Sequence, residues 1–257
     1  MSRTYIVGDV HGQLDKLIVH LQREVLIDNA CQWCGGDAVV WFLGDFFDRG
    51  PDGIGVVDLV MRLQGEAQKT GGRVSAILGN HELLISSVDK FGSMSDPFPF
   101  KEVWRMNGGQ ENDLAAFEQR HFEWISQLPA MAKEGENLLI HADSSLYVEY
   151  GRTVDAVNEA ARAVLMSDDP EAWRKMLVQF SDRFAFIGPN GRKHAKAFLH
   201  LYGAKRVIHG HTPIALLTGD DPETVTGPLI YADGLCMNAE AGMYLGVGFI
   251  ARLEEYI

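Results

Sequence analysis

Five short motifs in this sequence place Asp, Asn and His residues at turn positions directly after apolar runs. They are GDVHG (Gly8 to Gly12), GDFFDRG (Gly44 to Gly50), GNHE (Gly79 to Glu82), a lone His141 and GHTP (Gly210 to Pro213). The preceding runs TYIV, VVWFL, VSAIL, NLLI and KRVI have the composition of buried strands. Ligand sites in α/β proteins gather at the carboxyl ends of strands. The motifs therefore predict the convergence of six metal-binding side chains: Asp9, His11, Asp45, Asn80, His141 and His211.

These six residues divide into two metal shells that share Asp45. Asp9 and His11 are two residues apart, so in an extended chain their side chains point the same way. We expect one metal at Asp9, His11 and Asp45, and a second at Asp45, Asn80, His141 and His211. Mixed imidazole and carboxylate ligands favour Mn, Fe, Zn or Co over Ca or Mg. Two such ions about 3.5–4 Å apart activate water and hold both oxygens of an in-line displacement, as in a two-metal hydrolase.

Three further motif residues have types that suit the handling of a proton and a phosphate group. His81 directly follows Asn80, and neighbouring residues seldom bind the same metal pair, so His81 is better placed as a general acid for the leaving oxygen. Asp48 could hold the other ring nitrogen of His81 and keep the imidazolium charged. Arg49 has the planar fork that binds two phosphate oxygens at once.

Hydrophobic periodicity predicts the elements that position these motifs. The first 90 residues alternate between strands and helices, which predicts a parallel sheet with right-handed crossovers. The expected strands are 4–8, 38–43 and 73–78, and the expected helices are 13–26, 52–64 and 81–88. Beyond them we expect helix over 100–127, a strand hairpin over 131–142 and mostly helix over 153–203. The remainder is predicted to be β-rich, with strands at 205–209, 214–218, 228–232 and 243–253.

Length and motif distribution favour one domain over residues 1–257. The motifs extend from residue 9 to residue 211, so no division of the chain would leave an intact site on one side. The net charge of −12 argues against nonspecific binding to nucleic acid or to an anionic membrane. An anionic substrate stays compatible with this charge, because bound cations reverse the local field.

Cysteine usage and the N-terminus lead us to expect a cytoplasmic protein. The three cysteines are Cys31, Cys34 and Cys236, an odd number without a disulfide pattern, as in a reducing compartment. The first residues lead straight into a motif-bearing strand and have no signal-peptide architecture. Cys31 and Cys34 form an isolated CxxC pair, which we interpret as packing residues because a zinc site usually needs four ligands.

Taken together, the five motifs resemble the signature of the calcineurin-like metallophosphoesterases. The DRG of the second motif and the GNHE spelling resemble, more narrowly, the phosphoprotein phosphatase family and its bacterial and phage serine/threonine phosphatases. The resemblance spans residues 6 to about 240. It implies an α/β protein with a four-layer α/β/β/α sandwich and a dinuclear metal site at the strand carboxyl ends. It also implies hydrolysis of phosphomonoesters by direct attack of a metal-bridging hydroxide, with no phosphoenzyme.

The family's functional residues transfer to this chain at the motif positions. The resemblance implies the six metal ligands already assigned, with Mn²⁺ as the first candidate and Fe, Zn, Co or Ni as alternatives. It implies His81 and Asp48 as the acid pair and Arg49 as a phosphate ligand. The family also uses a second phosphate-binding arginine between the lone histidine and the GHT motif. Arg183 in FSDRFAF fits that role better than Arg174 or Arg192.

Three positions depart from the family pattern. Leu78 stands where family protein phosphatases often have arginine, and the segment after His141 reads ADSSL where the family is usually glycine-rich. His209 adds a histidine two residues before His211, and we interpret it as a supporting group and not a metal ligand. These departures concern the substrate more than the chemistry.

The expected partner is a phosphorylated protein or a small phosphoester, and three functions are weighed. The first is a phosphatase for phosphoserine and phosphothreonine in proteins. The second is a symmetrical diadenosine tetraphosphate hydrolase, a class that shares GDVHG, LGNH and RGP but typically lacks Asp48 and prefers Asp at the position of Glu82. The third is a noncatalytic scaffold, which usually loses ligands that this chain retains. Neither the oligomeric state nor the choice between phosphoserine and phosphotyrosine is readable from the sequence.

Overall fold

The computed structural model describes residues 3–256 and contains two β-sheets. The first sheet has the order β3-β2-β1-β9, with the first three strands parallel and β9 antiparallel to β1. Its strands are β1 (Thr4–Val7), β2 (Val39–Phe42), β3 (Arg73–Ala76) and β9 (Ala251–Arg252). The three parallel strands come from the first part of the chain, as predicted from the alternation of strands and helices.

The second sheet has the order β4-β5-β6-β8-β7. The central strands β5, β6 and β8 are parallel, and the edge strands β4 and β7 are antiparallel to their neighbours. Its strands are β4 (Met131–Glu134), β5 (Asn137–Ile140), β6 (Arg206–His209), β8 (Cys236–Asn238) and β7 (Leu229–Tyr231).

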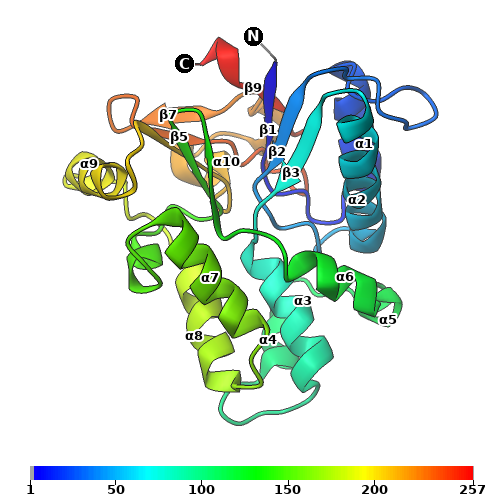
Figure 1. The fold of residues 1–257 in the computed structure, drawn as a ribbon, viewed down its shortest axis with the longest axis vertical. Helices are drawn as coiled ribbons and strands as arrows, with labels where there is room; N and C mark the ends of the chain where they lie inside the picture. The colour runs from blue at the N-terminus through cyan, green and yellow to red at the C-terminus, as the bar shows by residue number, and fades with distance from the viewer. Residues whose placement is uncertain (1–2, 257) are drawn as a thin grey trace.

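Helices cover the outer faces of both sheets and form a separate lobe beyond the strand ends (Figure 1). Helices α1 (Leu14–Arg23) and α2 (Gly53–Lys69) lie on the first sheet, and α9 (Gly191–Tyr202) and α10 (Ile214–Thr218) accompany the second. This layering confirms the predicted α/β sandwich. The lobe contains α3 (Asn80–Phe91), α4 (Phe100–Met106), α7 (Val154–Leu165) and α8 (Pro170–Phe180), with α5 (Glu111–Ala116) and α6 (Gln119–Ile125) beside it.

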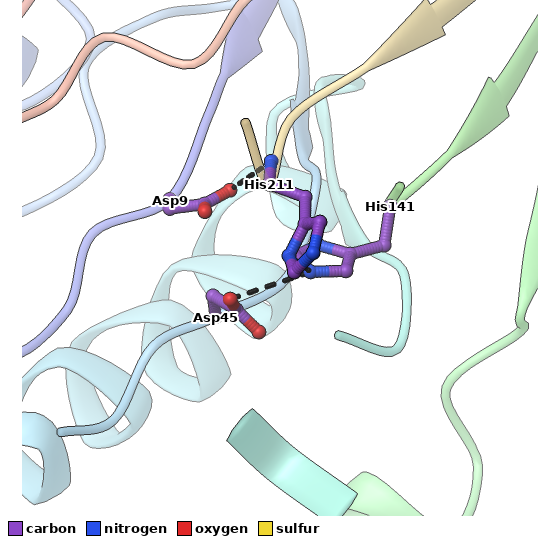
Figure 2. Close-up of side chains that lie close together, drawn as sticks. All are labelled: Asp9, Asp45, His141 and His211. Carbon is purple, nitrogen blue, oxygen red and sulfur yellow. Dashed lines mark hydrogen bonds and ion pairs between the residues drawn. The ribbon is translucent and has the colours of Figure 1, made fainter. Parts of the chain in front are cut away.

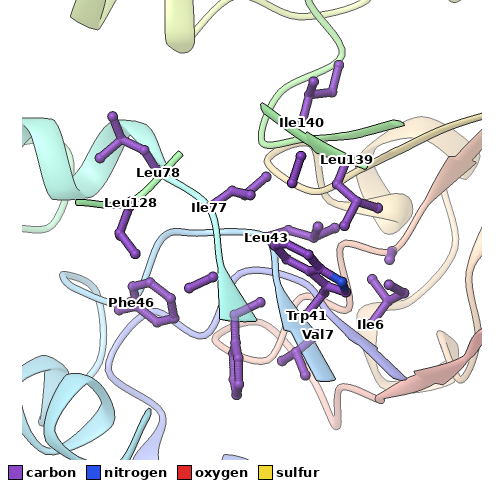
Figure 3. Close-up of a cluster of buried hydrophobic side chains, with 14 of the residues drawn as sticks. Ile6, Val7, Trp41, Leu43, Phe46, Ile77, Leu78, Leu128, Leu139 and Ile140 are labelled. Carbon is purple, nitrogen blue, oxygen red and sulfur yellow. The ribbon is translucent and has the colours of Figure 1, made fainter. Parts of the chain in front are cut away.

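The main hydrophobic core fills the space around the facing strands (Figure 3). The side chains of Ile6, Val7, Leu139 and Ile140 are fully buried, and Trp41 is almost so. Every residue of β1, β2 and β5 is buried, so these strands read as continuous apolar runs and not as alternating ones. This rigid core fixes the positions at which the strands end.

Within residues 3–256, no helix combines the length and apolar character needed to cross a bilayer.

Two secondary-structure predictions for the C-terminal region are wrong, and one strand there has no predicted counterpart. Residues 214–218, expected as a strand, form helix α10, because a five-residue apolar run does not distinguish helix from strand and Leu and Ala favour helix. Of the expected strand 243–253, only Ala251–Arg252 pairs with β1. Strand β8 has no counterpart among the predicted strands. Short 3₁₀ turns occur at Leu146–Glu149, Pro222–Thr224 and Leu253–Glu255.

A buried carboxylate from α5 caps the helix that follows the second motif. Oδ1 of Asp113 accepts hydrogen bonds from the backbone N–H groups of Gly53 (3.0 Å) and Ile54 (3.3 Å) at the start of α2. Asp113→Ala is expected to lower the free energy of unfolding by about 1–3 kcal/mol, because buried donors lose their acceptor. Urea denaturation measures this effect. Asp220→Ala, in an exposed turn, is the control, and an equal loss in both variants would contradict the capping role.

Candidate metal centre

The motif residues lie just past the carboxyl ends of parallel strands in both sheets. Asp9 follows β1, Asp45 follows β2, and Asn80 begins α3 after β3. His141 comes directly after β5, and His211 lies two residues past the end of β6. All are buried, as is His11. The structure therefore brings all six sequence-predicted ligands to one place where the two sheets meet the helical lobe.

One group of converging side chains draws on both sheets (Figure 2). Asp9, Asp45, His141 and His211 each offer a ligand atom, and these atoms lie within 4.8 Å of one another. His141 Nε2 is 3.3 Å from Asp45 Oδ2 and 3.1 Å from His211 Nδ1. Asn80 Oδ1 lies 2.8 Å from His141 Nε2. This group contains every residue expected for the second metal and also Asp9, which was expected at the first.

A second group shares Asp45 with the first. His11, Asp45 and His81 offer ligand atoms within 4.8 Å of one another, so His81, expected to act as an acid, lies in this group where Asp9 was expected. His11 Nε2 is 3.7 Å from Asp9 Oδ2 and also 3.7 Å from Asp45 Oδ2. Asp45 thus faces both groups, as expected of a bridging carboxylate.

The expectation of an extended chain between Asp9 and His11 is wrong. His11 has a φ of 47°, so the backbone turns into the left-handed region there, and Asp45 and His211 do the same with φ values of 54° and 65°. The side chains of Asp9 and His11 still converge, because of the turn and not because of strand alternation. Left-handed backbone at three non-glycine residues costs free energy, and such strain clusters at functional sites.

Backbone carbonyl groups determine which nitrogen of each histidine faces the centre. His11 Nδ1 is 2.8 Å from the Phe47 oxygen, His141 Nδ1 is 2.7 Å from the Leu43 oxygen, and His211 Nε2 is 3.1 Å from the Ser181 oxygen. A carbonyl oxygen only accepts, so these nitrogens carry the proton. The opposite nitrogens, His11 Nε2, His141 Nε2 and His211 Nδ1, face the two groups of converging side chains, as the coordinating nitrogens of metal-binding histidines do.

Two buried acceptor atoms at this centre lack a hydrogen-bond partner among residues 3–256. They are His11 Nε2 and Asp45 Oδ2, and the only other such side-chain atom in the described chain is Ser86 Oγ. A buried polar atom without a partner is costly and rare in folded proteins. Metal ions bind to lone pairs and require no donor, so the residues present fit a pair of divalent cations.

The charges of the site also favour the binding of divalent cations. Burial and the neighbouring Asp45 carboxylate raise the pKa of Asp9 to about 6. Burial also lowers the pKa of His11 and of His211 well below the usual range, which favours the neutral imidazole that binds metal. For His141, burial by itself lowers the pKa, but the Asp45 and Asp9 carboxylates outweigh it and raise that pKa to about 9. The clustered carboxylates favour positive charge in this cavity, and divalent cations supply it.

Two buried glutamates hold the backbone of the aspartate ligands in place. Glu82 Oε2 accepts from the N–H of Asp45 at 2.8 Å, and Glu240 Oε2 accepts from the N–H of Asp9 at 2.7 Å. Neither glutamate is among the site residues predicted from the sequence. Glu82 is the last residue of the GNHE motif, so its place in that motif could have identified it. Glu240 lies 231 residues from its partner Asp9 and belongs to no motif.

His81 and Asp48 form the contact expected of an acid pair. His81 Nδ1 lies 2.6 Å from Asp48 Oδ2, and the other oxygen of Asp48 accepts from Trp104 Nε1 at 2.7 Å. Burial by itself lowers the pKa of His81, but the Asp45 and Asp48 carboxylates outweigh it and raise that pKa. His81 Nε2 is also 3.9 Å from Asp45 Oδ2, so this ring borders the metal centre.

Two arginines border the centre, and two other candidates do not. Nη2 of Arg49 is 3.3 Å from His81 Nε2, and its guanidinium lies 4.5 Å from the centre of the Tyr244 ring. Arg183 is close enough to His211 that its charge adds to burial and to His141 in lowering that pKa. Arg174 is paired with Glu171 and Arg192 with Asp233 on the exposed surface. Of the three proposed second arginines, Arg183 is therefore the one at the site.

The remaining residues singled out in the sequence support the structure around the centre. His209 Nε2 bonds to the Tyr231 hydroxyl at 2.8 Å and its Nδ1 to the Gly210 oxygen at 3.0 Å, and it belongs to neither ligand group. Leu78 is fully buried, and its N–H donates to the Pro129 oxygen. Cys31, Cys34 and Cys236 are free thiols, and within residues 3–256 none joins a group of metal-binding side chains.

Comparisons with known proteins agree with this site. A family model described as calcineurin-like phosphoesterase matches residues 2–215. Shewanella-like protein phosphatase 2 of Arabidopsis thaliana is 34% identical over 83 residues, 32% of this chain and 21% of that protein. The symmetrical bis(5'-nucleosyl)-tetraphosphatase of Cronobacter sakazakii is 27% identical over 166 residues, 64% of this chain and 51% of that protein. These matches thus span about one fifth to one half of the relatives' own length.

A solved structure shares the fold of nearly the whole chain. A cold-active protein tyrosine phosphatase aligns with a TM-score of 0.74 at 20% identity, over 97% of this chain and 73% of that one. A further structure of a cold-active protein-tyrosine phosphatase, from a psychrophilic Shewanella, aligns with a TM-score of 0.71. At this identity the likeness concerns the fold alone. The family model, by contrast, covers most of the chain and all five motifs. The chain belongs to the calcineurin-like phosphoesterase family.

Proposed function

We propose that this protein is a metal-dependent phosphatase that hydrolyses phosphomonoesters, with phosphoserine and phosphothreonine of proteins as its main substrates. The observation that carries the proposal is the pair of unpartnered buried acceptors, His11 Nε2 and Asp45 Oδ2, beside the bonded pair of His81 and Asp48. A purely structural cluster would satisfy those acceptors with donors. A hydrolytic centre leaves them free for cations and keeps a proton donor next to them.

Two divalent cations are proposed to bind, one at Asp9, His11 and Asp45 and one at Asp45, Asn80, His141 and His211. When bound, such ions lower the pKa of water and neutralise charge on a phosphate group. The carbonyl bonds to Phe47, Leu43 and Ser181 orient the three imidazole ligands before any ion arrives. Glu82 and Glu240 do the same for the two aspartates through their backbone N–H groups.

The second part of the mechanism lies in the residues beside the cations. Arg49 and Arg183 bind the phosphate oxygens, and Arg49 is held for this by the Tyr244 ring and by its own N–H bond to the Gly108 oxygen at 2.7 Å. His81 supplies a proton to the leaving oxygen. Asp48 orients the His81 ring and favours its charged form, and Trp104 fixes Asp48.

A second candidate function is hydrolysis of a symmetrical dinucleoside tetraphosphate. The match to a protein of that name extends over 64% of this chain, twice the share matched by the plant protein phosphatase. The contact of Asp48 with His81 favours the phosphatase. The tetraphosphatase class that this chain resembles typically lacks an aspartate at the position of Asp48. The two functions differ in whether the leaving group is an alcohol or a nucleotide.

A comparison of substrates decides between these functions. We expect kcat/KM under Mn²⁺ to be at least about tenfold higher for phosphoserine and phosphothreonine peptides than for diadenosine tetraphosphate, a difference of about 1.4 kcal/mol. Phosphotyrosine peptides belong in the same series, since solved structures of this fold include tyrosine phosphatases. A preference for diadenosine tetraphosphate would replace the first proposal with the second.

Removal of the metals tests the centre itself. Protein treated with a chelator is expected to lose at least about 100-fold in kcat/KM, because the water and the phosphate lose their Lewis acid. Activity should return at about two equivalents of Mn²⁺ per chain, measured by elemental analysis, with Fe, Zn, Co and Ni tested in parallel. Full activity of a metal-free preparation would contradict the mechanism.

A further inference from the structure

The segment after His141 is hydrogen-bonded to the loop that carries Arg183. Oδ2 of Asp143 accepts from the N–H of Phe184 at 2.8 Å, and the backbone oxygen of Asp143 accepts from the N–H of Ala185 at 2.9 Å. Oγ of Ser144 donates to Asp182 Oδ2 at 2.9 Å. Asp143 and Ser144 are both completely buried. The loop is thus held by the Asp182 side chain immediately before Arg183 and by two backbone N–H groups immediately after it.

The held loop has a conformation that it would not adopt without support. Phe184 has a φ of 71°, in the left-handed region that a non-glycine residue rarely occupies, and its side chain is about half exposed. Such a conformation persists only where neighbouring groups fix it. The N–H bond of Phe184 to the Asp143 carboxylate is the contact that does so. Arg183 itself makes no hydrogen bond or ion pair within residues 3–256, so its guanidinium stays available to a ligand.

The same carboxylate also connects the loop to the metal centre. Oδ1 of Asp143 accepts from the Thr212 hydroxyl at 3.2 Å, and Thr212 is the neighbour of His211. His211 Nε2 in turn bonds to the Ser181 oxygen at 3.1 Å, at the start of the loop. The positions of His211 and Arg183 therefore depend on one hydrogen-bonded network around the buried Asp143 side chain.

We infer that Asp143 and Ser144 are positioning residues that hold Arg183 at the distance from the metal centre needed to bind a phosphate dianion. The inference rests on the proposed function, in which Arg183 is a phosphate ligand. It assigns a role to the ADSSL segment, where this chain departs from a glycine-rich pattern. Glycine has no side chain that could accept from the Phe184 N–H or donate to Asp182.

A double-mutant cycle with Mn²⁺-loaded protein tests this inference. The readouts are the dissociation constant of inorganic phosphate, from calorimetry, and kcat/KM for p-nitrophenyl phosphate. Arg183→Ala is expected to weaken phosphate binding at least about tenfold, as loss of a charge-assisted bond does. Ser144→Ala is expected to weaken it about three- to tenfold, since small misplacements of a binding group are costly. In the Arg183→Ala background, Ser144→Ala should change it less than about twofold.

Two further variants separate positioning from folding. Ser144→Thr keeps a hydroxyl and should restore most of the phosphate affinity. Ser145→Ala is the matched control, because the neighbouring Ser145 hydroxyl makes no hydrogen bond within residues 3–256, and it should behave as the wild type. Asp143→Asn provides an independent cycle with the same expected non-additivity. Metal content and melting temperature, measured for each variant, show whether the protein stays folded and loaded.

Each contrary result has a distinct meaning. A loss from Ser144→Ala that is equal with and without Arg183, or no loss at all, overturns the positioning role while the phosphatase proposal stands. Wild-type phosphate affinity in Arg183→Ala overturns both the arginine assignment and the inference. If the loaded wild type binds phosphate but hydrolyses no phosphomonoester, the proposed function fails, and the phosphate dissociation constants still decide the positioning role.

Discussion

Asp45→Asn is expected to lower kcat/KM for p-nitrophenyl phosphate by at least about 1,000-fold, equivalent to about 4 kcal/mol of transition-state stabilisation. The reason is that Asp45 faces both ligand groups, with Oδ2 3.7 Å from His11 Nε2 and 3.3 Å from His141 Nε2. Asparagine keeps the shape of the side chain but removes the charge and presents an N–H₂ group to one of the two groups. Both cations therefore lose affinity at once.

Elemental analysis beside the activity assay makes this result specific. The variant should hold well under two metals per chain at Mn²⁺ concentrations that saturate the wild type. Circular dichroism should show an intact fold, because the side-chain oxygen of the asparagine can still accept the hydrogen bond that Oδ1 of Asp45 accepts from the His81 N–H. Asp220→Asn makes the same chemical change in an exposed turn and should leave activity unchanged. An Asp45→Asn protein with two metals and full turnover would remove the bridging role.

His81→Asn is expected to show an effect that depends on the leaving group. For a phosphoserine peptide the loss in kcat should be about 100- to 10,000-fold, because an alkoxide needs a proton as it leaves. For p-nitrophenyl phosphate the loss should stay below about tenfold, since p-nitrophenolate is a stable anion. Asp48→Asn should reproduce part of this pattern, because it removes the 2.6 Å contact that orients the ring.

The ratio of the two losses, and not either loss alone, is the measurement that matters. Equal losses on both substrates would mean that His81 acts through the metals or through the fold, since its Nε2 lies 3.9 Å from Asp45 Oδ2. Metal content must therefore match the wild type for the comparison to hold. His200→Asn changes an exposed histidine on α9 and should leave both rates unchanged.

The parts of this site that local sequence patterns encode could be predicted from the sequence. Strand ends are marked by apolar runs followed by Gly-Asp, Gly-Asn or a lone histidine, and the structure places Asp9, Asp45, Asn80 and His141 accordingly. The fold class and the family followed from the order of these motifs. The order of the motifs was informative because five separate turns all match the family signature in the same order along the chain.

What the sequence did not reveal depends on contacts between distant residues. Glu240 holds the backbone of Asp9 from 231 residues away, and no periodicity or motif predicts that bond. The convergence of Asp9 and His11 was expected for the wrong reason, because a positive φ cannot be read from the letters DVH. Helix α10 was missed because five apolar residues suit a strand as well as a helix. The sequence favoured Arg183 over Arg174 and Arg192, and the ion pairs of Arg174 and Arg192 on the exposed surface gave this preference a physical reason.

The arrangement of the ligands over two sheets would give the two proposed cations unequal mechanical roles. The first set, Asp9, His11 and Asp45, follows strands of one sheet, whereas the second adds His141 and His211 from the other. An ion in the second set would therefore cross-link the sheets, and its binding free energy would also oppose their separation. By thermodynamic reciprocity, a substitution that leaves a cavity in the apolar layer between the sheets, far from any ligand, should weaken the binding of this ion more than that of the other.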